Sequence, residues 1–309
     1  MPRGISKASQ AAVTTAALRA LWFGPESRES AILCPIVPNS LAISDSFNML
    51  SNLWRHRYLI GQLVRRDVLL KYRGSYLGIG WSFFYPLLLL GTFTLVFGQV
   101  FGSRWPQPEQ GEAPLALAIY CGLVIFTPFS EIASAAPRLI LGYQNYVKKI
   151  IFPTEILPVM LVLSASVHAL INLGLLILAL AYFAKLHPTL LLLPLVLLPA
   201  FLFALGIAWL LAAAGVFVRD LVHVMPVFMQ ILMFVSPVFY PASVAPESLR
   251  WIYLANPLGR LIEDLRRVTL GGEILNWETW LATLGAGLAM ALLGYAFFQR
   301  GKEEFADVL

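Results

Sequence analysis

Charged side chains are rare in this sequence, and those best placed to do chemistry lie beside or inside long apolar stretches. Glu131 lies inside one such stretch, and an ionisable group there is by default a functional candidate, because burying a charge in hydrocarbon is costly. The alternative is that Glu131 hydrogen-bonds a neighbouring helix and only fixes packing. The four cations nearest to the start of the first apolar stretch are Arg65, Arg66, Lys71 and Arg73.

The residue patterns of common catalytic and metal sites are absent from the sequence. It contains no GxxxxGK[ST] phosphate loop, no HExxH, no CxxC and no GxSxG. His168 and Asn172 are four residues apart and share a helix face. A single imidazole without further ligands favours interhelical hydrogen bonding over a metal site. We therefore expect no catalysis, metal or cofactor in this chain, whose function should be passage or anchoring.

Composition identifies an integral membrane protein. Charged residues make up 13% of the 309 and hydrophobic residues 59%, whereas soluble domains average about 25% charged. A helix needs about 20 apolar residues to cross the hydrocarbon core, and helices are expected because unpaired backbone groups in lipid are costly. Six candidate spans meet this length, at roughly 76–101, 113–136, 156–183, 189–218, 221–240 and 277–298. In the fifth of them, Pro237 predicts a kink.

The distribution of Lys and Arg orients these spans. If the cations before the first span lie on the inner side, six spans leave both termini inside. The two short outer loops then contain only two cations, Arg104 and Lys185. Cations then collect on one side, as the positive-inside rule expects. The net charge of +5 is therefore interpreted as a topology signal and not as a sign of a nucleic-acid partner.

Residues 1–48 differ from the rest of the sequence, being polar and rich in Ser and Ala. We expect a weakly structured cytosolic extension there, followed by a six-span domain at 49–309. Met49 directly precedes the patterned region and is a candidate translation start.

Two inner segments look like helices that do not span. Residues 56–73 carry apolar residues at helical spacing with charges between them, which favours a helix in the membrane interface; a basic flank of the first span is the alternative. Gly74 and Gly78 then allow a sharp turn into the bilayer. In NYVKKIIFPTEILP, Pro153 bars helix continuation. The apolar residues Ile150–Phe152 of this segment favour a short amphipathic helix at the cytoplasmic surface. The alternative is that these apolar side chains are simply buried among lipid headgroups.

The outer tract between the fifth and sixth spans is too long for a turn and too patterned for disorder. Asn256 can cap a helix, Pro257 suits its first position and Gly271 can end it. Glu263 and Arg267 stand at i, i+4 and are predicted to pair. We expect two short helices that dip into the outer leaflet and return, with a surface-lying loop as the alternative.

Four segments resemble one family, in order and at matching spacing. They are RRDVLLKYRGSYLGIGWSFFYPLL, then FSEIASAAPRLI with NYVKKIIFPTEILP, then FVRDL, and finally SPVFYPASVAPESLRWIYLANPL. Together they are similar to the permease subunits of polysaccharide-exporting ABC transporters, the group that moves O-antigen, capsule and teichoic-acid chains. The resemblance runs from about residue 50 to the C-terminus.

The resemblance implies a fold, partners and a location. The fold is all-α, with six spans, an N-terminal interface helix, a cytosolic coupling helix at about 146–156 and a re-entrant helix pair after span five. Two copies form the pore, and two copies of a separate ATPase bind ATP and Mg²⁺ below it. The substrate is a lipid-linked glycan, and the location is the bacterial inner membrane.

The resemblance suggests roles for the docking segment and the outer gate, and the residues themselves suggest roles for aromatic and cationic side chains. The residues expected to dock into the ATPase are Lys148, Lys149, Ile150, Ile151, Phe152, Pro153 and Glu155. The candidates for flat faces against which sugars could stack are Trp81, Phe83, Phe84, Tyr85, Phe93, Phe97 and Phe101. Contact with lipid or packing between helices is the alternative role for these side chains. Glu131 is the polar candidate in the same path. The four cations before span one are candidates for the diphosphate of the substrate. The outer gate, at about 243–271, would contain Trp251, Tyr253, Arg260, Glu263 and Arg267.

The leading prediction is a permease subunit that exports a lipid-linked polysaccharide and is driven by ATP hydrolysis in a separate chain. A type-2 ABC exporter of a drug or small lipid shares the six-span plan and is the alternative. A membrane enzyme acting on lipid-linked sugars is a third reading, against which the missing catalytic cluster argues.

Overall fold

The computed structural model describes residues 51, 53–74, 76–96, 115–144, 152–183, 186–239 and 256–308. Within these ranges every regular element is a helix and there is no strand, which confirms the predicted all-α class for this part of the chain. The predicted extension at 1–48 and most of the predicted coupling helix lie outside the described residues. So do Trp251 and Tyr253 of the predicted gate.

Four helical segments in the described ranges are long and apolar enough to cross a membrane. Each coincides with a predicted span, because an uninterrupted apolar run of this length has few other stable environments. The first is Ala116–Gly142, which covers α6 (Leu115–Ala135) from its second residue onward, η4 (Ala136–Arg138) and α7 (Leu139–Gly142). The others are α9 (Ile156–Tyr182), η5 (Pro188–Leu192) with α10 (Leu193–Phe217), and α14 (Trp277–Lys302).

The first and fifth predicted spans are shorter than expected where the structure describes them. Helices α5 (Trp81–Leu95) and α11 (Leu221–Val235) have 15 residues each, or about 22 Å of helix. The predicted end of span five at residue 240 is wrong, because Ser236 is extended, as favoured for a residue before proline. Pro237 therefore lies beyond the helix and does not kink it. That α5 and α11 cross the membrane stays a prediction.

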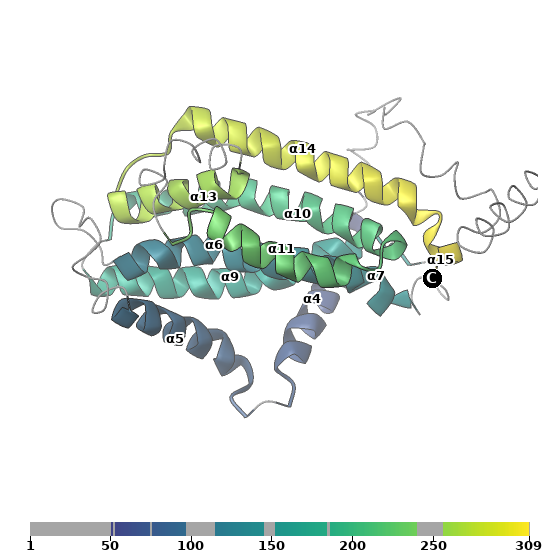
Figure 1. Cartoon of the computed structure of the whole chain (residues 1–309), viewed down its shortest axis with the longest axis horizontal. Coiled ribbons are helices and arrows are strands. Elements are labelled where there is room, and N and C mark those ends of the chain that lie inside the picture. Colours follow the sequence, from purple (N-terminus) through teal and green to yellow (C-terminus); the bar gives the residue numbers. More distant parts are fainter. Residues whose placement is uncertain are drawn as a thin grey trace, which may run out of the picture. The chain divides into compact units, whose positions relative to one another are not determined.

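A sharp turn joins the predicted interface helix to α5. Helix α4 (Arg57–Tyr72) confirms a helix at the predicted position. Gly74 and Gly78 in the following turn have φ of 88° and 50°, a region that residues with a Cβ rarely adopt. After η2 (Gly78–Gly80), α5 leaves at an angle to α4, so the two helices form a V in Figure 1.

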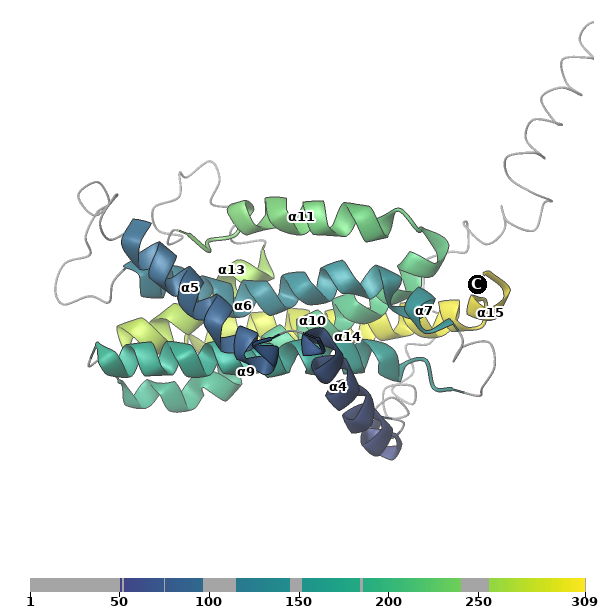
Figure 2. The same ribbon diagram turned by 90° about the horizontal axis from the view of Figure 1, so that it is seen from below.

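Helices α10 and α14 pack with their backbones in contact. A Cβ placed on Gly294 would lie 2.1 Å from the carbonyl oxygen of Gly206, and one on Gly287 would lie 2.8 Å from that of Pro199. Small residues at these positions let the two helices approach so closely. Both Figure 1 and Figure 2 show α14 running along α10.

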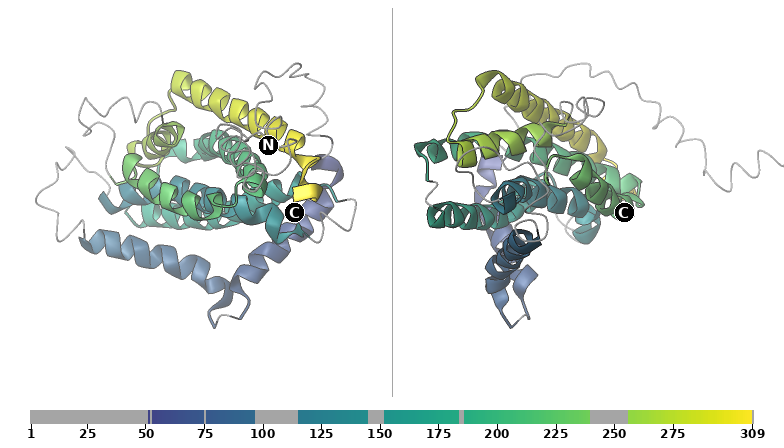
Figure 3. Two further views of the ribbon diagram at one scale, coloured as in Figure 1. Left: turned by 45° about the vertical axis from the view of Figure 1, so that its right-hand side comes forward. Right: turned by 60° about the vertical axis from the view of Figure 1, so that its left-hand side comes forward.

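The outer tract contains one described helix, α13 (Pro257–Arg266). The predicted cap is confirmed, since the Asn256 side chain accepts a hydrogen bond of 3.0 Å from the Leu258 amide, and Pro257 takes the first helical position. A π-helical turn, η7 (Arg267–Gly271), extends the helix. Its C-cap is Gly272, with φ of 63°, one residue after Gly271, which was predicted to end the helix. The chain closes with α14 and α15 (Phe305–Val308), and α14 lies across the bundle from α4 and α5 (Figure 3).

Candidate functional site

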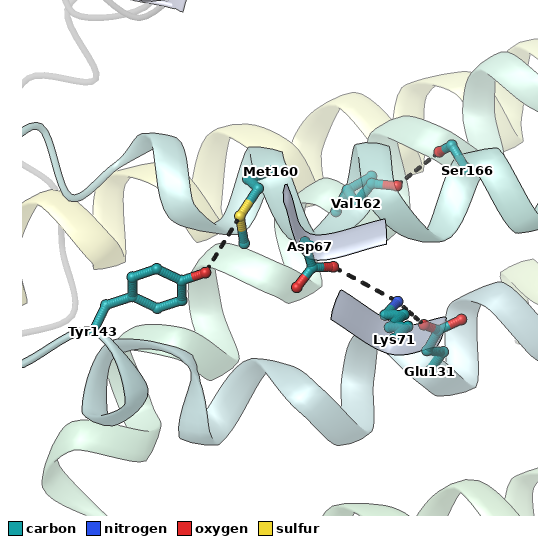
Figure 4. A network of polar contacts seen from close by, with 7 residues as sticks. All are labelled: Asp67, Lys71, Glu131, Tyr143, Met160, Val162 and Ser166. Carbon is teal, nitrogen blue, oxygen red and sulfur yellow. Dashed lines mark hydrogen bonds and ion pairs between the residues drawn. The ribbon is translucent and has the colours of Figure 1, made fainter. Parts of the chain in front are cut away.

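A cluster of charged side chains ties the predicted interface helix to α6. Lys71 on α4 donates a hydrogen bond from Nζ to Oε1 of Glu131, and its Nζ lies 3.7 Å from Oδ2 of Asp67 (Figure 4). Lys71 thus lies beside two side chains of opposite charge. The partner of Glu131 is thus a residue of a neighbouring helix, as the packing alternative expects. The predicted substrate contacts of both residues stay predictions.

A second contact joins α4 to the end of the α6–α7 segment. Arg66 donates a hydrogen bond of 3.1 Å from Nη2 to the Tyr143 hydroxyl, and its guanidinium carbon lies 5.5 Å from the centre of that ring. This geometry combines a hydrogen bond with a cation–π contact. The Tyr143 hydroxyl also lies 3.8 Å from Sδ of Met160 on α9 (Figure 4). The other two candidate cations for a diphosphate, Arg65 and Arg73, are exposed.

The predicted coupling segment is described only from Phe152 onward, so Lys148, Lys149, Ile150 and Ile151 lie outside the described residues. Phe152 and Pro153 are partly exposed. Glu155 is 5% exposed, and its Oε2 accepts a hydrogen bond of 2.7 Å from Lys302 on α14. The carboxylate therefore points into the bundle, and a docking role for it stays a prediction.

The described aromatic side chains of α5 lie on its exposed surface. Trp81, Phe83, Phe84 and Tyr85 are all exposed, and Trp81 contacts Phe84 edge-to-face at 5.8 Å. The side chains of Phe93, Phe97 and Phe101 lie outside the described residues. Exposure in a single chain is compatible with a substrate path and with lipid contact alike, so the sugar-stacking role stays a prediction.

Glu263 on α13 and Arg267 at the start of η7, which were predicted to pair, bond to other residues. Glu263 accepts a hydrogen bond of 2.9 Å from Arg266, three residues later, and Arg267 donates one of 3.1 Å to Glu273. The helix changes to π geometry at Arg267, which alters the i, i+4 offset on which the prediction relied. Arg260 is half-buried. Burial raises the pKa of Asp264 in the same helix to about 6.

Arg266 is the residue of this region that sequence reasoning missed. It is 7% exposed, and besides Glu263 it donates to the carbonyl oxygens of Ala118 at 3.0 Å and Val238 at 2.7 Å. One guanidinium thus joins α13 to α6 and to the chain after α11. Its five N–H groups suit such a junction, since they can reach several acceptors at once. An arginine in an outer tract resembles a surface cation, and nothing in its local spacing indicates burial.

Comparison with known proteins assigns the chain to a family. Residues 58–270 match the ABC-2 type transporter family. The chain belongs to this family. It is 28% identical over 262 residues to the O-antigen export system permease protein RfbA of Myxococcus xanthus, covering 84% of this chain and 98% of that protein. Two proteins of the same name from Klebsiella pneumoniae are 25% and 24% identical over 267 residues, or 85% of this chain and 100% of theirs.

Membership in the ABC-2 family makes this chain a multi-pass membrane transport subunit with an ATPase partner. The family match begins at Tyr58, within α4, and ends at Leu270, within η7. All the contacts of α4 and α13 described above therefore lie within the ABC-2 region, except that of Arg267 with Glu273. The contact between Glu155 and Lys302 joins this region to α14.

Proposed function

We propose that this chain is the permease subunit of a transporter that exports a lipid-linked polysaccharide of the O-antigen, capsule or teichoic-acid type across the bacterial inner membrane. The observation that carries the proposal is the set of three relatives named as O-antigen export permeases, aligned over 98% to 100% of their own lengths. Transport is driven by hydrolysis of Mg-ATP in two copies of a separate ATPase. Two copies of this chain form the pore.

The described helices support a six-span plan with both termini in the cytoplasm. Four long segments account for spans two, three, four and six, and α5 and α11 occupy the places of spans one and five. In this plan α4 lies at the inner surface, where its cations follow the positive-inside rule. Its contacts with Glu131 and Tyr143 support this position, because the proposed plan puts both partners toward the cytoplasmic end of the second span.

The segment at about 146–156 is proposed to be the coupling helix that docks into the ATPase. It directly precedes α9, and Phe152 and Pro153 at its end are partly exposed, as a docking contact requires. On the outer side, we propose that the tract at about 243–271 forms a re-entrant gate. Support comes from α13, which is short, capped at Asn256 and held to α6 by a buried arginine.

Deletion of the gene in its native host tests the substrate. We expect surface polysaccharide to disappear and lipid-linked glycan to accumulate on the cytoplasmic side, with both effects reversed by a plasmid copy. Deletion of the partner ATPase gene is the matched control and should give the same phenotype. Unchanged surface polysaccharide would contradict the proposal, and new sensitivity to a drug in such a strain would favour the small-molecule alternative.

A further inference from the structure

The chain that leaves the predicted coupling segment enters the protein interior at once. Thr154, Glu155, Ile156 and Leu157 are all buried, at 5% exposure or less. Turn-type hydrogen bonds of 3.1 Å from the amides of Ile156 and Leu157 to the carbonyls of Pro153 and Thr154 start α9 here. A displacement of the coupling segment therefore cannot be absorbed by a loose linker before α9.

Glu155 connects this point to α14 by two routes. Its carboxylate accepts the 2.7 Å hydrogen bond from Lys302 in the last turn of α14. Its backbone carbonyl accepts one of 3.0 Å from the indole nitrogen of Trp209 on α10, which is fully buried. The ring of Trp209 in turn contacts Tyr295 of α14 edge-to-face, with ring centres 5.2 Å apart.

The two helices that receive these contacts, α10 and α14, pack with their backbones in direct contact. Along α10 and α14 the backbones touch at Gly206 and Gly294, so sliding or separation would open a gap between close-packed surfaces. Helix α10 also touches the chain that leads into the coupling segment. A Cβ on Gly215 would lie 2.1 Å from the carbonyl oxygen of Pro137 in η4. The α10–α14 pair thus contacts the chain both before and after the coupling segment.

We propose that Glu155 is a positioning residue that makes the α10–α14 pair follow the coupling segment when the ATPase moves it, and that it does not itself bind the ATPase. This inference rests on the proposed function for its ATP-driven movement. The side chain of Glu155, which is 7% exposed and already bonded to Lys302, would have to leave its partner and the interior to reach another subunit. Leaving would break a hydrogen bond between two charged groups, which belongs to the strong class of protein hydrogen bonds.

The test uses the complete complex with its ATPase, reconstituted in vesicles with lipid-linked glycan. Variants E155Q and K302M should bind the ATPase and hydrolyse ATP like the wild type. Glycan exported per ATP should fall roughly 2- to 30-fold, the range for residues that carry coupling between sites. K302R keeps a donor cation and should retain the wild-type ratio. E303Q removes an exposed carboxylate beside Lys302 and is the matched control.

A second measurement does not depend on glycan. Spin labels at Gln144 and Glu304, both exposed, report the distance between the start of the coupling segment and the end of α14, in a background without the two native cysteines. In the wild type this distance should stay constant when the ATPase binds ATP. In E155Q and K302M it should change, because α14 no longer follows.

Three outcomes would overturn the inference. The first is loss of ATPase binding in E155Q, and the second is an unchanged ratio of glycan exported per ATP in both E155Q and K302M. The third is a distance between the labels that stays constant on ATP binding in E155Q as it does in the wild type. The double variant should be no worse than either single one, since both remove the same contact. Additive losses would count against the contact as the cause. A wild-type complex that moves no glycan would contradict the proposed function, while the label distances would still test Glu155.

Discussion

At the scale of single residues, the pair of Lys71 and Glu131 can be separated experimentally into a structural and a substrate role. Both side chains are about one-third exposed, at 31% and 34%, so the pair itself should contribute no more than about 1 kcal/mol to stability. We expect K71M and E131Q to lower the free energy of unfolding in detergent by this amount. The double variant should match the single ones.

Export by the same variants then assigns the roles. If the two residues act only through their contact, K71M and E131Q should reduce export equally, because each removes the same contact between α4 and α6. A much larger loss in K71M would indicate a separate contact of the lysine with substrate phosphate. K71R, which keeps the charge, is the control, and normal export in all variants would contradict any role of the pair.

At the scale of elements, Arg266 is expected to hold α13 in place. Replacing it by Met removes three hydrogen bonds, which leaves the carbonyls of Val238 and Ala118 and the carboxylate of Glu263 without this donor. Because buried polar groups left without partners are costly, R266M should lower the free energy of unfolding by about 2–4 kcal/mol. Its neighbour gives the control, since R267M breaks an exposed pair and should cost less than about 1 kcal/mol. Equal losses would show that the buried contacts add nothing.

The contact between α10 and α14 can be tested with two glycines of one helix. A methyl group on Gly294 would meet the Gly206 carbonyl at 2.1 Å, whereas one on Gly285 finds nothing within 4 Å. G294A should therefore lower the free energy of unfolding by about 1–3 kcal/mol, as overpacking does. G285A should be neutral or stabilising, because alanine favours helix. Thermal unfolding in detergent measures both, and a neutral G294A would mean that the helices are not in backbone contact.

The elements also show what sequence can and cannot predict. Apolar length predicted the four long segments, and local chemistry predicted the cap at Asn256. The end of span five was misplaced because Pro237 was interpreted as a kink, although proline restricts the residue before it. The bonds of Lys71 to Glu131 and of Lys302 to Glu155 join residues 60 and 147 positions apart. Contacts of this kind follow from tertiary packing and leave no local pattern.

At the scale of the whole molecule, coupling to the ATPase requires a surface that binds and an interior that follows. The partly exposed Phe152 belongs to the surface in our proposal, and the buried Glu155 to the interior. The two residues are three positions apart, yet their variants should fail in different ways. This contrast allows the coupling segment to be tested as one part of the transporter and not only as a set of contacts.

Replacing Phe152 with Asp should uncouple the ATPase without preventing membrane insertion, because it places a charge in the apolar group at the docking surface. If Phe152 is a central contact, worth about 2 kcal/mol or more, binding of the ATPase should weaken by roughly 30-fold. F183D, at the opposite end of α9 and also partly exposed, is the matched control and should bind the ATPase normally. Co-purification and titration of the ATPase measure both. Normal binding and export in F152D would refute the docking role, while leaving the contact of Glu155 with Lys302 to be judged by its own variants.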